Sequence, residues 1–197
     1  SLKSLDIRAF AGDKHRSVDA PPFGGGPGMV LRPDVMDAAL ASIDKLPGRR
    51  IYLSPRGKCF DQSVAEALVE DPGVVLICGR FEGLDQRLID ARKLEEISLG
   101  DYVLSGGEIA SLAVLDTCVR LLPGVLGSKE GLEEESFTKG LLEYPLYTQP
   151  REWEGKTVPE VLLSGHHGDI KTWQQQQAEM ITRDRRPDLW ARYREKS

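Results

Sequence analysis

The alternation of short strand-like runs with helical patterns constrains the fold of this chain most. Strand-like runs occupy residues 50–53, 74–78 and 96–99. The middle run, VVLIC, is continuously apolar, as in a strand that is covered on both faces. Apolar residues recur at helical spacing in the segments 34–44, 61–69 and 108–122, and Asp61 is placed to cap the second of these. The alternation predicts an α/β fold with a mostly parallel sheet, whose ligand sites lie beyond the carboxyl ends of the strands.

The pattern changes near Gly127. A long polar stretch with several prolines follows it and has no sustained periodicity, which is typical of a functional lid or a linker. Two further helices are predicted at residues 168–182 and 186–195, with too few apolar residues for a core of their own. We therefore expect an α/β domain over residues 1–127, an interdomain lid or linker over 128–160, and a small helical domain over 161–197.

Composition excludes several classes of protein. No run approaches the roughly 18 apolar residues that cross a bilayer, and no export signal is recognisable. Cys59, Cys78 and Cys118 are widely spaced without a CxxC pair, so neither a disulfide framework nor a thiolate zinc site is indicated, and we expect a reducing cytoplasm. The net charge of -5 argues against indiscriminate binding of nucleic acid, although a local basic patch is compatible with it.

The segment PPFGGGPGM, residues 21–29, is the most unusual loop. Glycine readily adopts positive φ and proline fixes φ, so this segment belongs to neither a helix nor a strand interior. Two interpretations stay open: a flexible linker, or a shaped loop that brings the backbone close to a ligand.

Three further glycine-bearing turns follow the strand-like runs: LSPRG, CGRFEG and LGDYVLSGGE. Together they offer backbone donors and acceptors to a flat polar ligand such as adenine, although ordinary tight turns remain an alternative. Neither GxxxxGK[ST] nor GxGxxG occurs, so a nucleoside without a polyphosphate is the better prediction.

The order of longer motifs makes a resemblance specific. GDKHRSVDAPPFGGGPGM, LICGRFEGLDQR, SLGDYVLSGGE, RLLPGVLG and VPEVLLSGHHGDIKTW occur as in the bacterial tRNA (guanine-N(1)-)-methyltransferases of the SPOUT superfamily, which the chain resembles over nearly its whole length. The resemblance implies a deep trefoil knot in the α/β domain, bound S-adenosylmethionine, and a homodimer with active sites at its interface. It also implies a C-terminal helical domain that holds the anticodon stem-loop, and methylation of ring nitrogen 1 of guanosine 37 in tRNA.

The resemblance also assigns binding residues. Glu82 would face the methionine end of the cofactor, and the adenosyl pocket would consist of Tyr52, Leu53, Ser54, Pro55, Gly79, Leu99, Gly100, Tyr102, Leu104, Gly106 and Gly107. Pro27 and Gly28 resemble the wall against which the target guanine packs in the site of the partner subunit. His15, Arg16 and Asp19 would line that site or contact RNA, and for His15 a solvated loop position is an equal alternative.

Methyl transfer to this nitrogen requires a base for its proton and a donor for the developing oxyanion. Arg120 matches the arginine of the family. Glu135 stands where the family usually has an aspartate before Ser-Phe, and we expect it to be the base, with Glu133 and Glu134 as alternatives. Glu143 replaces a second aspartate and is expected to contact the substrate.

A magnesium ion is expected to assist, as in the family, although no dedicated site is recognisable. His166 and His167 are better explained by helix capping or RNA contact than by a metal site.

The sequence departs from the family pattern at its N-terminal end. The family has a strand and a helix before the motif that contains His15, whereas this sequence starts almost directly ahead of it, so we expect a first strand of the sheet to be missing.

A non-catalytic RNA-binding module is the rival interpretation of the function. It is suggested by the aromatic residues Trp173, Trp190 and Tyr193 and by the arginine-rich cluster at residues 183–186. A regulatory protein that binds a nucleotide is a third interpretation of the function.

Overall fold

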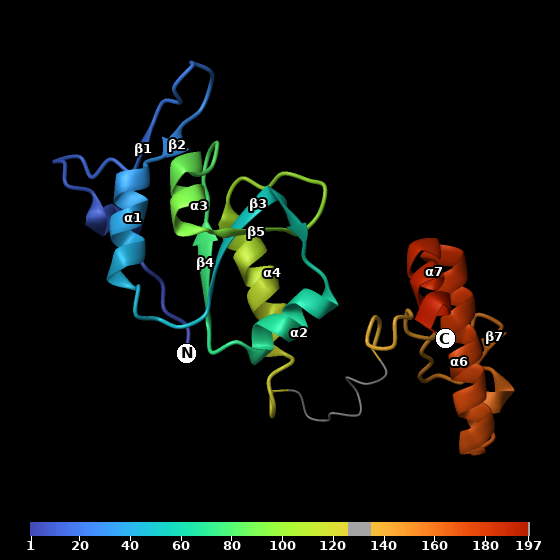
Figure 1. The fold of residues 1–197 in the computed structure, drawn as a ribbon. Helices are drawn as coiled ribbons and strands as arrows, with labels where there is room; N and C mark the ends of the chain where they lie inside the picture. The colour runs from blue at the N-terminus through green and yellow to red at the C-terminus, as the bar shows by residue number, and fades with distance from the viewer. Residues whose placement is uncertain (126–134, 197) are drawn as a thin grey trace. The chain divides into compact units, whose positions relative to one another are not determined.

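The computed structural model describes residues 1–125 and 135–196, which divide into two compact units, Ser1–Leu126 and Gly127–Ser197 (Figure 1). Residues 128–134 of the predicted lid therefore lie outside the described part of the chain.

The first unit contains the parallel sheet that the alternating pattern predicts. Its strands are β3 (Arg49–Cys59), β4 (Val74–Cys78) and β5 (Glu95–Ser98), in the order β4-β3-β5. Both neighbours of β3 run parallel to it. Pairing with β5 breaks off at Leu53 and resumes at Lys58, so residues 54–57 form a bulge beside the end of β5. The three predicted runs are thus confirmed, and the first strand is longer than expected.

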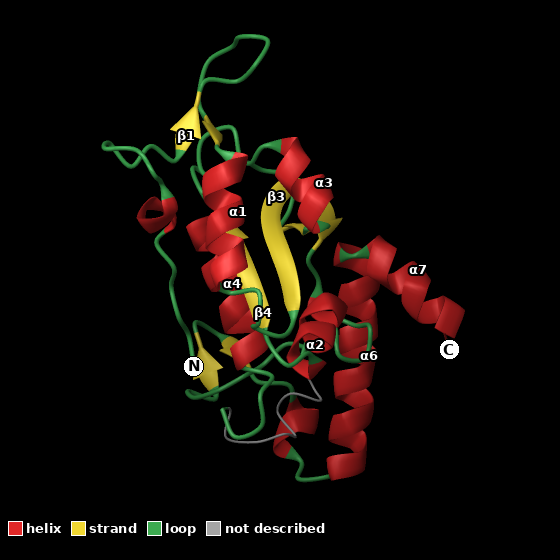
Figure 2. Cartoon of the chain, turned by 60° about the vertical axis from the view of Figure 1, so that its left-hand side comes forward, coloured by secondary structure: helices red, strands yellow, loops and turns green. Residues whose placement is uncertain are grey.

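Helices cover both faces of this sheet (Figure 2). They are α1 (Pro33–Ser42), α2 (Gln62–Glu70), α3 (Gln86–Arg92) and α4 (Gly107–Val119). Along β3, Tyr52 packs with α1 and α3, whereas Ile51 and Leu53 pack with α2 and α4. This alternation follows from the two-residue period of a strand, and it explains why the strand-like runs are apolar on both sides.

Helix boundaries follow local signals. The side chain of Asp61 accepts a hydrogen bond of 3.0 Å from the backbone N–H of Val64, which confirms the predicted cap of α2. Helix α4 ends at Val119, earlier than predicted. Helix α3 was not predicted; Asp85 caps it by accepting from the N–H of Arg87, and it ends at Lys93, which has a left-handed backbone.

The loop PPFGGGPGM closes a small antiparallel pair. Strand β1 (Asp19–Ala20) pairs with β2 (Val30–Leu31), and the loop connects them, extending beyond the pair in Figure 1. The 3-10 helix η1 (Ile7–Phe10) precedes this pair and packs against the core beside α1. The loop therefore connects two paired strands within one unit, and the interpretation as a flexible linker is wrong.

The second unit contains the two predicted helices, α6 (His167–Arg185) and α7 (Pro187–Lys196). Its polar segment also holds a hairpin that sequence reasoning missed, β6 (Glu152–Trp153) with β7 (Lys156–Thr157), and the 3-10 helix η2 (Glu160–Leu163). Thr182 of α6 is fully buried, and its hydroxyl accepts a hydrogen bond of 2.8 Å from the N–H of Leu142. This contact fixes the chain near Leu142 onto α6.

Candidate functional site

A cavity of about 370 Å³ lies beside the bulge of β3 and beyond the ends of β4 and β5. Its size suits a small-molecule ligand. Every residue that was expected to bind the cofactor lines it: Tyr52, Leu53, Ser54, Pro55, Gly79, Glu82, Leu99, Gly100, Tyr102, Leu104, Gly106 and Gly107. The expectation that LSPRG is a turn after its strand is wrong, because these residues form the bulge inside β3. The bulge and the other two glycine-bearing turns converge on one site, as the position of ligand sites in α/β folds predicts.

Close backbone contacts hold two of these turns together. The N–H of Gly107 donates to the carbonyl of Gly79 at 2.9 Å, and Arg80 forms a β-bridge with Gly106. A Cβ at position 107 would lie 2.7 Å from Cα of Cys78, closer than real Cβ atoms come. Glycine is required here because the N-terminus of α4 packs directly on the end of β4.

Tyr52 forms a buried part of the cavity wall, with 6% of its surface exposed. Burial raises the pKa of its phenol above the usual value of 10.0, and a hydrogen bond with the backbone of Leu84 partly opposes this shift. The phenol is therefore neutral at physiological pH and presents a mainly apolar surface.

Charged side chains at the cavity form ion pairs that sequence reasoning did not assign. Arg80 Nε lies 2.9 Å from Glu108 Oε1, and Arg56 lies 3.1 Å from Glu96 Oε1. Arg56 and Arg80 stand inside the LSPRG and CGRFEG motifs, so their place in the turns was the available signal. Their pairing partners are distant in sequence and could not be predicted.

The end of the glycine loop meets this cavity within the same chain. The N–H of Glu82 donates to the carbonyl of Met29 at 3.0 Å. Gly28 has a φ of +88°, and a Cβ there would lie 2.3 Å from Oε1 of Glu82. The loop thus brings its backbone close to a cavity residue. Pro27 is exposed beside it, and its contact with a base in a partner subunit stays a prediction.

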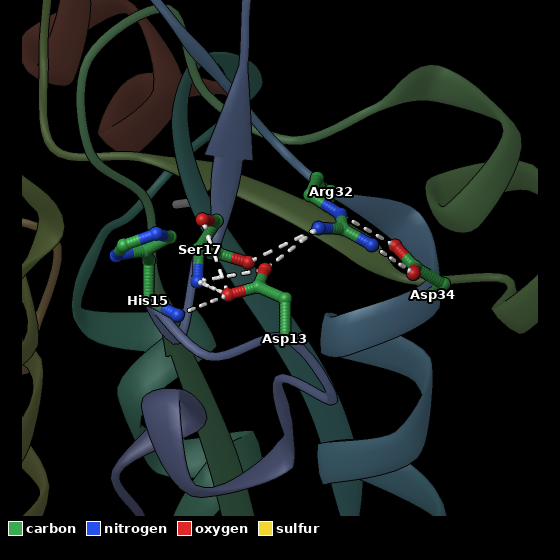
Figure 3. A network of polar contacts seen from close by, with 5 residues as sticks. All are labelled: Asp13, His15, Ser17, Arg32 and Asp34. Atoms are coloured by element: carbon green, nitrogen blue, oxygen red, sulfur yellow. Dashed lines mark hydrogen bonds and ion pairs between the residues drawn. The ribbon is translucent and has the colours of Figure 1, made fainter.

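The remaining residues predicted to contact substrate lie outside the cavity lining. His15 and Arg16 are exposed on a turn before β1, and Asp19 is the first residue of β1. Figure 3 shows His15 on this turn. Glu143 belongs to the second unit, where its N–H donates to Oγ of Ser136 at 2.9 Å. This bond holds Glu143 next to the residue that follows Glu135.

The two predicted catalytic residues belong to different units. Arg120 is half-buried at the C-cap of α4, where its N–H donates to the carbonyl of Asp116 at 3.1 Å. Glu135 is half-buried at the start of a closed loop in which the N–H of Phe137 donates to the carbonyl of Leu141 at 2.7 Å. The alternatives Glu133 and Glu134 lie outside the described residues.

The described ranges contain neither a recognisable metal site nor a membrane-spanning helix. No three His, Cys, Asp or Glu side chains there are arranged to hold a metal ion, so the expected magnesium has no located site. His166 occupies the N-cap of α6, but its side chain makes no capping hydrogen bond. Among the described helices none combines the length and apolar character that a membrane span needs.

The chain matches known proteins along nearly its entire length. The family model for tRNA (guanine-1)-methyltransferase TrmD matches residues 1–192. The tRNA (guanine-N(1)-)-methyltransferase of Rhodospirillum rubrum is 58% identical over 193 residues, covering 98% of this chain and 81% of that protein. The protein of the same name from Bartonella tribocorum is 57% identical over 195 residues, covering 98% of this chain and 83% of the relative.

Proposed function

Because the chain belongs to the tRNA (guanine-1)-methyltransferase family, we propose that it is an enzyme that methylates ring nitrogen 1 of guanosine in tRNA. The cofactor is S-adenosylmethionine and the target is guanosine 37, next to the anticodon. The observation that carries the proposal is the convergence of the three glycine-bearing segments on one cavity. A cytoplasmic location belongs to the same proposal and is supported by three free cysteines.

The cavity residues fit an adenosyl group with a methionine tail. Its wall is built largely from turns whose backbone N–H and C=O groups suit the polar edge of adenine, with Tyr52 and Leu53 as apolar surface. The carboxylate of Glu82 suits the ammonium of the methionine end. The bound cofactor supplies an electrophilic methyl group, and the turns orient it.

The chemistry of the target nitrogen requires the two groups carried over from the family. Glu135 accepts the N1 proton, and the guanidinium of Arg120 donates hydrogen bonds to the guanine oxygen as negative charge develops on it. The planar fork of an arginine suits this role because it holds several donors in fixed directions. The bond between Ser136 and Glu143 supports this assignment, since it orders the loop that carries Glu135.

We include a homodimer in the proposal because α4 has an uncovered apolar face. Ile109, Leu112 and Val119 are 64%, 59% and 44% exposed, and their spacing places them on one side of the helix. The opposite side, with Ala110 and Val114, packs on the sheet. A second copy of the chain would cover this face by isologous packing.

A SPOUT-type trefoil knot is part of the same proposal. The segment between β5 and α4 ends against the end of β4, through the contact of Gly107 with Cys78 and Gly79. A chain that is threaded through a loop needs such a close, glycine-lined crossing. Knots are rare in proteins, so this feature rests mainly on the family.

The aromatic residues that suggested a non-catalytic RNA-binding module pack against one another. Trp190 stacks on Tyr193 with ring centroids 5.6 Å apart, and Trp173 packs against Tyr147 at 6.2 Å. Aromatic side chains that pack on each other stabilise the unit, and their presence needs no RNA to explain it. We propose that the second unit holds the anticodon stem-loop for the enzyme, using its exposed basic side chains.

Calorimetry with S-adenosylmethionine tests the proposal. The full chain should bind the cofactor without RNA, because the cavity lies within the first unit. A non-catalytic module would give no binding heat at about millimolar cofactor, and that result would remove the methyltransferase proposal. ATP should not displace S-adenosylhomocysteine, and displacement would revive a nucleotide-binding regulator.

A further inference from the structure

Three consecutive basic residues lie exposed on one ordered turn. Lys14, His15 and Arg16 are all exposed, and they precede β1. Arg16 has a φ of 51°, which is uncommon for a residue with a side chain, and its N–H donates to the carbonyl of Asp13 at 3.1 Å. A turn held in this conformation is fixed by its surroundings.

Asp13 organises this turn from inside. Its carboxylate accepts hydrogen bonds from the N–H of His15 at 2.9 Å and from the N–H of Ser17 at 3.0 and 3.1 Å. The hydroxyl of Ser17 donates to it as well, at 3.3 Å. The bond from the Ser17 backbone is the main cause that lowers the pKa of Asp13, so the group is ionised at neutral pH. In Figure 3 the imidazole ring of His15 points away from Asp13.

Arg32 ties the turn to the start of α1. One guanidinium nitrogen lies 3.5 Å from Oδ2 of Asp13 and 3.4 Å from the carbonyl of Ser17 (Figure 3). The remaining nitrogens donate to Asp34, at 3.1 Å from Nε and 2.5 Å from Nη2. The backbone N–H of Arg32 also donates to the carbonyl of Val18 at 2.8 Å. The guanidinium therefore bridges the turn and the first residues of the helix.

We propose that Asp13 and Arg32 are positioning residues that hold Lys14, His15 and Arg16 for contact with phosphate groups of the RNA substrate. This inference rests on the proposed function and adds to it the two residues that hold the expected RNA contacts in place. Lys14 and Arg16 place two positive charges side by side on an exposed turn, and a polyanion is a partner that suits them. A fixed turn loses less conformational freedom on binding than a mobile loop, so the same contacts yield more affinity.

The substitution Asp13→Ala is a sharp test, because two physical effects predict opposite changes in tRNA affinity. It removes a negative charge, so bulk electrostatics predicts tighter binding of tRNA, whereas a disordered turn predicts weaker binding. We expect the Kd of the full chain for tRNA to rise about threefold to tenfold, and the slope of log Kd against log salt to fall by about one. Asp37→Ala is the matched control, because it removes the same charge from α1, where its partner is Arg92 and not Arg32; its Kd should stay within about twofold of wild type.

Substitutions of Arg32 test the same positioning role through a second residue. Arg32→Gln should raise KM for tRNA with little change in kcat or in cofactor affinity, and Arg32→Lys should restore only part of the loss, because a lysine lacks the planar fork. The double variant Asp13→Ala/Arg32→Gln should be no weaker than the worse single variant, since both act through one turn. If Asp13→Ala does not fold, Asp13→Asn should show the same direction with a smaller effect.

Two outcomes separate the inference from the proposed function. If wild type binds and methylates tRNA but Asp13→Ala binds it as tightly as wild type or more tightly, this inference alone is overturned. If wild type does not bind tRNA, the proposed function fails and this inference fails with it.

Discussion

At the scale of single residues, Gly28 connects the glycine loop to the cavity. Alanine at this position would place its Cβ against the Glu82 side chain, which would have to rotate. We expect Gly28→Ala to weaken binding of S-adenosylmethionine about tenfold, the effect of losing one hydrogen bond to a charged group. Isothermal titration calorimetry measures the Kd of each variant for S-adenosylmethionine.

Gly25 supplies the matched control for that prediction. It also has a positive φ, of 79°, but a Cβ there would meet nothing within 4 Å. Gly25→Ala and Gly28→Ala should therefore share a strain of about 1–2 kcal/mol in thermal unfolding, and only the second should lose cofactor affinity. Equal cofactor affinity for the two variants would show that Glu82 does not depend on the loop.

The role of Glu135 is also a question about one residue. If its carboxylate accepts the N1 proton, Glu135→Gln should bind the cofactor normally but methylate about two to four orders of magnitude more slowly in single turnover. Glu135→Asp restores the residue that is usual in the family, and it should keep activity only if the loop closed by Ser136 and Glu143 adjusts to the shorter side chain. A wild-type rate for Glu135→Gln would move the role of base to Glu134, or to Asp19, which is expected to line the guanine site or contact RNA.

Among the secondary-structure elements, helix α7 has an exposed ion pair at its first turn that adds a small stabilisation. Arg186 binds Asp188 through two bonds of 2.8 and 2.6 Å, and the hydrogen bond from Arg186 is the main cause that lowers the pKa of Asp188 from 3.8 to about 2. A carboxyl whose pKa is lower in the folded state stabilises that state above its unfolded pKa. This contribution is lost as the pH falls through the folded value.

Asp188→Asn should therefore unfold more easily than wild type near about pH 6, and the difference should shrink toward about pH 2. Far-ultraviolet circular dichroism during urea unfolding measures the helical signal. Because the pair is exposed, the difference at pH 6 should be small and should shrink in high salt. A difference that stays constant across this pH range would contradict the assignment.

The elements also show what the sequence could and could not predict. Strands β3 to β5 and helices α1, α2, α4, α6 and α7 were predictable, because apolar spacing and caps such as Asp61 are local signals. Helix α3 has only 7 residues and the strands of the β6–β7 hairpin have 2 each, too short for a periodic pattern. The cavity residues came from the family motifs, whereas the pairing of Arg80 with Glu108 and of Arg32 with Asp13 depends on the folded chain.

At the scale of the whole molecule, the exposed face of α4 predicts self-association. Leu112→Lys would place a charge in the centre of that face and should convert a dimer to a monomer in sedimentation, with loss of methylation. Ala67→Lys, on an exposed position of α2, adds the same side chain elsewhere and should leave the dimer intact. A wild-type chain that is fully active as a monomer would contradict the proposed dimer.

The most direct test of the central claim is to identify the methylated nucleoside. The full chain, in excess over a tRNA transcript with guanosine at position 37, is incubated with S-adenosylmethionine, and the digested RNA is analysed by mass spectrometry. We expect about one 1-methylguanosine per tRNA, and none in a transcript with adenosine at position 37. A methyl group on another atom or at another position, or no methylated guanosine at all, would contradict it.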